Sequence, residues 1–377
     1  MSGQPCAEAP SQVFSIKRIT SQNQCQCLLH RFSILPKTSR IMLGPNDYTI
    51  GWICALHTEH VAAQVFLDET HDRFDDSARR DDNDYTLGRI GKHNVVIAIL
   101  PHWQPGLVSA AMVAKDMVRS FPNVRLCLMV GVGGGVPTRH DIRLGDVVVS
   151  SVVYGGGGVL QYDYGRANQA QGLVMTGHLN QPPMFAQIAV NGLKAQYQID
   201  GNGIQDAIEN ILQKRPWLRN EYQRPHPTTD RLYKSSFIHK GSNEASCSKI
   251  CGDNQTNLVS RVERSEHEDN PAIHHGLIAS ANQIMNDASL RDKLAAEKDV
   301  LCFEMEAAGL MNYFPCMVIR GIDNYSDTHN NSQWRGYAAM AAAAYAKDLL
   351  KRIAPSKVEA ERKLGDILYR VSAFSFS

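Results

Sequence analysis

The chain has 377 residues, and 39 Lys and Arg against 38 Asp and Glu leave a formal net charge of +1. This near-neutral balance argues against a general nucleic-acid binder, which needs a basic surface to displace counterions. Hydrophobic content of 43% excludes wholesale disorder, and no apolar run reaches the roughly 18–20 residues of a membrane span. The composition favours small-molecule chemistry in a cytoplasmic protein, with neither nucleic acid nor a membrane as partner.

Residues 1–46 are rich in Ser, Gln and Cys, show no sustained hydrophobic period and carry Glu8 as the single acid. A basic, acid-poor start resembles a mitochondrial transit peptide, but no amphipathic helix is evident. We therefore predict a disordered extension, with the transit peptide as the alternative.

From residue 48 the pattern predicts an alternation of strands and helices. Strands are predicted at 48–55, 85–90, 94–100, 124–130 and 146–153, and helices at 57–67 and 108–121. The short turn at 91–93 indicates a β-hairpin between its flanking strands. The continuous apolar run at 124–130 is typical of a strand covered on both faces.

The second half begins with a helical pattern at 184–213 and a polar stretch at 215–270 that we interpret as an insertion or lid, since ordered cores rarely contain so long a loop. Regular structure then returns: we predict strands at 276–279, 300–303 and 316–322, and helices at 289–297, 304–311 and 334–353. These elements form one predicted α/β domain over 47–355, followed by a tail at 356–377 with room for one amphipathic helix.

Cys247 and Cys251 form a C-x3-C in the polar stretch. No second pair stands near them at the spacing of a zinc site, which favours an ordinary loop, so no metal is predicted.

Generic nucleotide-binding motifs are absent, because G-x-G-x-x-G fails after Val130 and no P-loop occurs. No G-x-S-x-G occurs either, which excludes the usual nucleophile elbow of hydrolases. What remains is a strand that runs directly into a predicted glycine loop formed by Gly131, Gly133 and Gly134. Glycines there let the backbone approach a ligand closely, at the sheet edge where α/β proteins bind ligands.

Two further features indicate a site. Glu304 and Glu306 stand where an apolar strand turns into the next element, and buried carboxylates are costly unless they bind something. The alternative is that one or both cap a helix N-terminus. Farther on, the apolar strand from Val318 ends abruptly in Asp323 and Asn324, and polar groups crowded at a strand end are typical of a site.

Seven segments in order resemble the nucleoside phosphorylase and nucleosidase superfamily, and most of all its fungal branch. They are Ile53–Glu59, Val130–Gly135, Leu144–Ser150, Tyr162–Gly165, Gly276–Ser280, Phe303–Ala308 and Arg320–Asp327. The resemblance implies a single three-layer α/β/α domain with a mixed, partly closed central sheet. It also implies cleavage of the N-glycosidic bond of nucleosides without metal or organic cofactor, by a homo-oligomer.

The resemblance also assigns roles. Glu306 matches the carboxylate that grips the ribose 2′-hydroxyl and stabilises the positive charge of the transition state, with Met305 against the sugar. Ile284 and Met285 fall where the family lines the base pocket, and Phe303 forms another wall.

Asn324 falls where many members have an aspartic acid that protonates the departing purine. An amide is no general acid, but it can hydrogen-bond a 6-oxopurine, which favours inosine or guanosine. It equally allows a weakened enzyme in which Asp323 or Asp327 partly substitutes.

For the acceptor, related phosphorylases carry two arginines and a serine where this chain has Glu59, Met129 and Val132. Glu59 matches instead the nucleosidase glutamate that activates water. We therefore predict hydrolysis, with a phosphorylase using Arg139, Arg143 or a lid arginine as runner-up. A non-catalytic nucleoside sensor is the alternative from another class.

Overall fold

The computed structural model describes residues 43–74, 81–152, 156–169, 172–240, 247–265, 268, 271–329 and 332–368. Most of the predicted extension at 1–46, and the end of the tail at 356–377, lie outside these residues. The described residues from Leu43 onward belong to one compact unit, which begins with a 3-10 turn at Pro45–Asp47.

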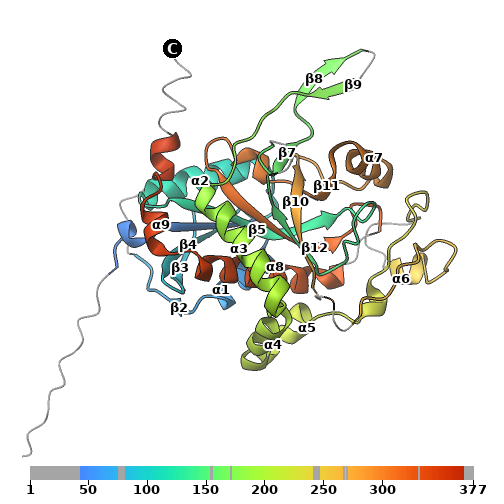
Figure 1. Ribbon diagram of the computed structural model, residues 1–377, viewed down its shortest axis with the longest axis horizontal. Helices are drawn as coiled ribbons and strands as arrows, with labels where there is room; N and C mark the ends of the chain where they lie inside the picture. The colour runs from blue at the N-terminus through green and yellow to red at the C-terminus, as the bar shows by residue number, and fades with distance from the viewer. Residues whose placement is uncertain are drawn as a thin grey trace, which may run out of the picture. The chain divides into compact units, whose positions relative to one another are not determined.

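A mixed sheet forms the centre of this unit (Figure 1). Its strands are ordered β11-β10-β6-β12-β5-β1-β4-β3-β2, and β11 also pairs with β5. Because β11 bonds both β10 and β5, five of these strands close into a ring, which confirms the mixed, partly closed sheet. The bounds are β1 (Ile50–Cys54), β2 (Glu69–Thr70), β3 (Tyr85–Ile90), β4 (His93–Ile99), β5 (Leu126–Gly135), β6 (Val147–Ser150), β10 (Ile273–Ser280), β11 (Val300–Glu304) and β12 (Cys316–Asn324).

Two further pairings lie off this path. The short strand β7 (Val159–Gln161) pairs with β10. Strands β8 (Gly165–Asn168) and β9 (Gly172–Met175) form a separate antiparallel hairpin that projects from the sheet in Figure 1.

Helices surround the sheet. Their bounds are α1 (His57–Val65), α2 (Leu107–Ser120), α3 (Met184–Asp200), α4 (Ile204–Lys214), α5 (Arg219–Tyr222), α6 (Cys247–Ile250), α7 (Ala288–Lys298), α8 (Arg335–Arg352) and α9 (Pro355–Glu359). The alanine-rich α8 packs directly on β12 and β5. Small side chains permit this approach: a Cβ added at Gly321 of β12 would lie 1.9 Å from the Ala338 carbonyl oxygen.

Most predicted elements, including the β3–β4 hairpin, are confirmed, and three are corrected. The helix predicted at 184–213 is two helices, because Gly201 at φ 74° ends α3. The helix predicted at 304–311 is only the 3-10 turn Ala307–Gly309. The predicted glycine loop belongs to β5, which continues through Gly135 and stays paired with β12 and β11.

The insertion at 215–270 contains little regular structure in its described part: α5, α6, two 3-10 turns and an isolated bridge between Tyr233 and Leu258. Arg264 anchors it to the core through two bonds of 2.6 Å to the buried Asp146 carboxylate. Burial opposes ionisation of Asp146, but Arg264 and His274 outweigh it and lower its pKa.

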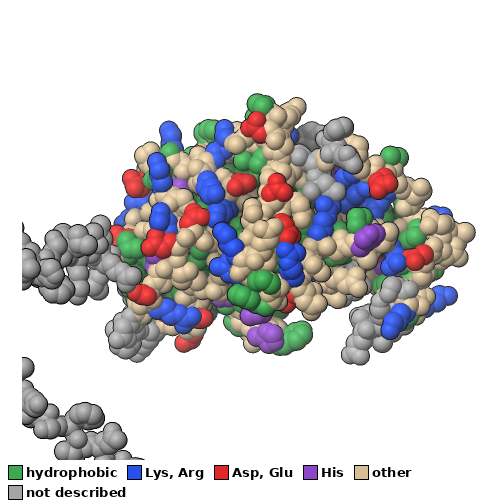
Figure 2. Space-filling model, turned by 90° about the horizontal axis from the view of Figure 1, so that it is seen from below, with side chains coloured by type: hydrophobic (Ala, Val, Ile, Leu, Met, Phe, Trp, Pro, Cys, Tyr) green, Lys and Arg blue, Asp and Glu red, His purple; other side chains and the backbone are tan. Residues whose placement is uncertain are grey.

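The face seen in Figure 2 carries Lys and Arg side chains interspersed with Asp and Glu. This mixture agrees with the near-zero net charge. None of the helices in the described part of the chain combines the length and apolarity that crossing a bilayer requires.

Candidate active site

Most of the predicted site residues lie around the place where β5, β11 and β12 are side by side. The register pairs Arg320 of β12 with Gly131 of β5, and it pairs Gly134 with both Asn324 and Phe303. Neighbouring strands are about 4.8 Å apart, so Asn324 and Phe303 flank Gly134 at a separation of about 10 Å. Sheet closure therefore gathers segments that are far apart in the sequence.

Glu59 reaches this edge from the first turn of α1 and is buried. Its Oε2 accepts hydrogen bonds from the backbone N–H groups of Ala55 (2.7 Å) and Leu56 (2.9 Å). Its Oε1 accepts one from Val132 of β5 (2.8 Å). Glu59 is therefore a fixed carboxylate between two chain segments rather than a solvated helix residue.

Gly131 makes room for that carboxylate. A Cβ at this position would lie 2.3 Å from Glu59 Oε1 and 2.7 Å from its Oε2. At Gly134 a Cβ would lie 2.7 Å from Asn324 Oδ1, and at Gly133 it would lie 2.8 Å from Cys302 Sγ. All three predicted glycines thus provide close approach, although they do so within a strand.

Arg320 is the central cation of the site. It is buried, and its Nη2 donates to Glu304 and to Glu306, the latter at 3.1 Å. Glu59 adds to these charges in raising the pKa of Arg320 against the effect of burial. One fixed guanidinium is therefore ion-paired with two carboxylates of the Phe303–Ala308 segment, and the charge of a third, from α1, acts on it as well.

The two glutamates of the Phe303–Ala308 segment have different surroundings. Glu304 accepts hydrogen bonds from the backbone N–H groups of Glu306 (3.0 Å) and Ala307 (3.0 and 3.2 Å). Glu304 therefore caps the turn that follows β11, which is the 3-10 turn Ala307–Gly309 and not the predicted α-helix. Glu306 is bound to Arg320 through Oε2. Met305 between them is half-buried.

Burial shifts the ionisation of both predicted functional glutamates. It raises the pKa of Glu306 to about 7, opposed by Arg320 and supported by the charges of Glu304 and Glu59. Burial also raises the pKa of Glu59, although Arg320 and three backbone N–H donors counteract it. A raised pKa makes a carboxylate a stronger base near neutral pH.

The end of β12 is bulged at Asp323, where the register shifts between Ile322 and Asn324. Asn324 donates from Nδ2 to Asp323 Oδ1 (2.6 Å) and accepts at Oδ1 from the Ser326 backbone N–H (2.8 Å). Asp323 is buried and also accepts from Arg335 Nε at 3.1 Å. Burial raises the pKa of Asp323, partly offset by Arg335 and Asn324.

Asp327, the other carboxylate considered as a substitute acid, accepts from the His329 backbone N–H (2.7 Å) and lies 3.8 Å from Arg291. Both acidic candidates therefore have protein partners, and Asp323 is the one bonded to Asn324.

An apolar cluster forms beside Gly134. Phe303 and Met285 are both buried in it, with Tyr162 edge-on to Phe303 at 5.4 Å between ring centroids. Ile284 lies outside this cluster and is 70% exposed. Of the three apolar residues predicted for the base pocket, Phe303 and Met285 therefore lie in one cluster and Ile284 does not.

Four arginines considered as phosphate ligands, two of them from the lid, have carboxylate partners elsewhere. The ion pairs are Arg139–Asp299, Arg143–Asp141, Arg261–Asp230 and Arg264–Asp146. Three of these arginines line a cavity of about 600 Å³ at the insertion, next to Trp334 rather than at Glu59.

The sequence reasoning assigned no role to Arg320, although a signal existed. An arginine inside the apolar strand Cys316–Asn324 is costly to bury unless carboxylates pair with it. The two glutamates of the Phe303–Ala308 segment are such partners. The sequence could therefore have predicted that this segment lies beside the Arg320–Asp327 segment.

Comparison with known proteins places this geometry in a fold class. No protein-family model matches the chain. It resembles a putative 5′-methylthioadenosine/S-adenosylhomocysteine nucleosidase from Borrelia burgdorferi B31 bound to adenine, with TM-score 0.50, 15% identity and coverage of 80% of this chain and 99% of that one. It also resembles futalosine hydrolase of Helicobacter pylori strain 26695, with TM-score 0.49, 15% identity and coverage of 81% and 97%. The chain has the nucleoside phosphorylase and nucleosidase fold, so the resemblance read from the sequence is confirmed at that level.

A sequence relative is a nucleotide-binding leucine-rich repeat (NLR)-like protein of Hyaloscypha variabilis, 41% identical over 324 residues. The match covers 86% of this chain and 31% of that protein, so the chain spans about a third of its relative's length.

Proposed function

We propose that this chain hydrolyses the N-glycosidic bond of a purine nucleoside at the carboxylate cluster around Arg320. The observation that supports this most strongly is that the buried Arg320 guanidinium donates to Glu306 at 3.1 Å and to the Val132 carbonyl oxygen at 3.3 Å, while the Val132 N–H donates to Glu59 at 2.8 Å. These bonds link the carboxylate predicted to hold the ribose with the one predicted to activate water. The negative charge of Glu59 also contributes to the raised pKa of Glu306.

In the proposed reaction the bond between C1′ of the sugar and the purine nitrogen breaks, and the electron pair leaves with the base. Positive charge develops on the sugar ring. Glu306, as a carboxylate, accepts a hydrogen bond from the ribose 2′-hydroxyl and stabilises that charge, with Met305 against the sugar. Glu59 removes a proton from the water whose oxygen attacks C1′.

The base is proposed to lie between Asn324 and the wall formed by Phe303 and Met285. The departing base needs a proton or a hydrogen-bond donor. Asn324 offers a donor, and Asp323, whose pKa burial raises, lies 2.6 Å from its amide. An amide that both donates and accepts favours 6-oxopurines such as inosine and guanosine.

Water is proposed as the acceptor rather than phosphate. The buried carboxylate of Glu59 occupies the edge where phosphate would bind, and the candidate phosphate ligands named above are ion-paired elsewhere. The homo-oligomer, the domain boundaries and the cytoplasmic location stay predictions.

The test is a panel of nucleosides incubated with and without inorganic phosphate, with the sugar product identified by chromatography. Free ribose formed without phosphate is the expected result. Ribose 1-phosphate formed only with phosphate would identify the runner-up, a phosphorylase.

A second candidate function is nucleoside sensing without catalysis. Asn324 supports it, because the amide replaces a general acid and both of its polar atoms already have partners. The relative's name describes a nucleotide-binding protein, which agrees with ligand binding as the role of this candidate. Calorimetry that detects nucleoside binding in the absence of any released base would favour this candidate.

A further inference from the structure

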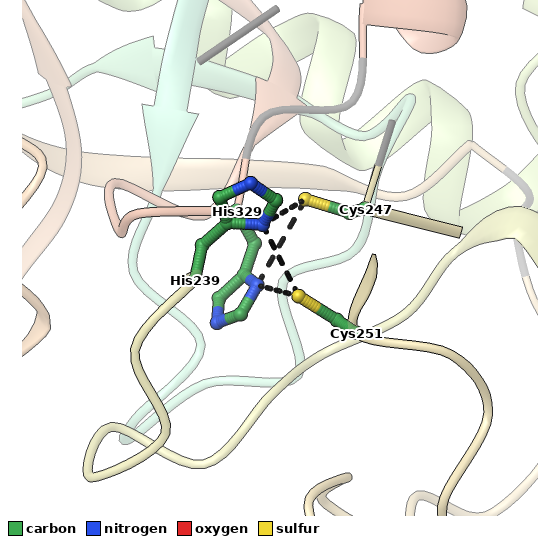
Figure 3. A group of neighbouring side chains, drawn as sticks. All are labelled: His239, Cys247, Cys251 and His329. Carbon is green, nitrogen blue, oxygen red and sulfur yellow. Dashed lines mark hydrogen bonds between the residues drawn. The ribbon is translucent and has the colours of Figure 1, made fainter. Parts of the chain in front are cut away.

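Four side chains outside the carboxylate cluster converge on one point in the insertion: His239, Cys247, Cys251 and His329 (Figure 3). Their ligand atoms, two imidazole Nδ1 and two sulfurs, all lie within 4.8 Å of one another. Cys251 and His329 are buried, and the other two are half-buried. Buried thiols and imidazoles grouped in this way are the donor set that proteins use for zinc.

The spacing fits a tetrahedral ion. The four sulfur–nitrogen separations are 3.1 and 3.3 Å from His239 Nδ1 to Cys251 and Cys247, and 3.5 and 3.9 Å from His329 Nδ1 to the same sulfurs. Zinc bonds of about 2.3 Å to sulfur and about 2.0–2.1 Å to nitrogen, at the tetrahedral angle, put S and N about 3.6 Å apart. The observed separations bracket that value.

The local backbone brings the two thiols together. Cys247 begins α6, and the Cys251 N–H donates to the Cys247 carbonyl at 2.8 Å, which is one helical turn. Residues four apart on a helix share a face. The C-x3-C spacing therefore presents both sulfurs in one direction.

His329 is held in the form that binds a metal. Its Nε2 lies 2.9 Å from the Phe237 carbonyl oxygen, which can only accept, so Nε2 carries the proton and Nδ1 keeps its lone pair. Tyr233 stacks on the His329 ring at 4.0 Å and Phe237 at 5.5 Å between centroids. This aromatic shell fixes the ring orientation.

We propose that His239, Cys247, Cys251 and His329 bind one Zn²⁺ in a closed Cys2His2 site. Binding displaces the two thiol protons to solvent and leaves the imidazoles neutral. Four protein ligands leave no open position for water, which makes the site structural rather than catalytic.

The position of the ligands gives the ion a specific task. Three ligands belong to the insertion, whereas His329 follows β12 by five residues and its N–H binds Asp327. The ion therefore fastens the insertion to the loop that continues from Asn324. The sequence spacing favoured an ordinary loop because no second ligand pair stands near Cys247 and Cys251 in the sequence. The tertiary structure supplies that pair as His239 and His329.

The test measures metal directly and needs no nucleoside. The full chain, purified without chelator from zinc-supplemented medium, is expected to contain about one zinc ion per chain, measured by inductively coupled plasma mass spectrometry. Its cobalt-exchanged form is expected to show the visible bands of tetrahedral Co²⁺ and the charge-transfer band of thiolate ligands. Cys251→Ser and His329→Ala are expected to weaken zinc binding by more than about tenfold.

Matched controls are Cys127→Ala, a buried thiol of β5, and His226→Ala, a histidine of the insertion outside the cluster. Both are expected to keep the full zinc content. The proposal is overturned if wild-type protein holds no zinc and takes up no cobalt, if Cys247 and Cys251 are found as a disulfide, or if the two ligand variants bind zinc like wild type. Should a ligand variant fail to fold, the cobalt spectrum of the wild-type chain decides.

Discussion

Gly131→Ala is the substitution that tests most directly how the strand positions Glu59. The new Cβ would lie 2.3 Å from Glu59 Oε1, whereas ordinary contacts begin at 3.4 Å. The carboxylate must therefore move by about 1 Å, which breaks its 2.8 Å bond from the Val132 N–H. A displacement of that size at a reacting group costs about 10²-fold in rate, and overpacking costs about 1–3 kcal/mol of stability.

The assay is kcat/KM for nucleoside hydrolysis beside the free energy of unfolding in urea. Gly135→Ala is the matched control, because its Cβ would meet Ile322 and Ile142 side chains at 2.8 and 3.0 Å but not Glu59. The control is expected to lose stability and keep its rate. Adding Gly131→Ala to Glu59→Ala should cost little further rate, since the displaced group is already gone. An undiminished kcat/KM in Gly131→Ala would refute the reasoning.

Three other predictions concern the same cluster. Glu306→Gln is expected to lower kcat by about 10²–10³-fold while the chain folds normally, as checked by steady-state kinetics and circular dichroism; wild-type turnover would reject the role of Glu306. The kcat/KM of wild type is expected to fall as the pH drops below about 7, because Glu306, whose pKa is raised to about 7, then gains a proton and no longer acts as a carboxylate; a profile flat from pH 5 to 8 would contradict this. Arg320→Leu is expected to cost about 3–5 kcal/mol of unfolding free energy in urea, since it leaves buried carboxylates without their cation; a loss below about 1 kcal/mol would show that the carboxylates do not need it.

The sequence by itself determined most of the strands, and it singled out Glu306 as a candidate site residue. Apolar runs such as 124–130 predict buried strands because a sheet covered on both faces has no polar side, and β5, β11 and β12 were found from that signal. Glu306 was singled out because a carboxylate on an apolar element is costly unless it has a partner.

Only the tertiary structure decided which of these residues meet. Ring closure through the β11–β5 pairing brings Glu306 beside Arg320, and Glu59 reaches β5 at Val132 from a helix more than 240 positions before Glu306. The glycines after Val130 were expected to form a loop, yet pairing on both sides keeps them in β5. His329 likewise lies close to Cys247 and Cys251 only in the tertiary structure, since it stands far from them in the sequence. Local patterns report burial and period, whereas a site assembled from distant segments depends on strand order and register, which no short stretch of sequence encodes.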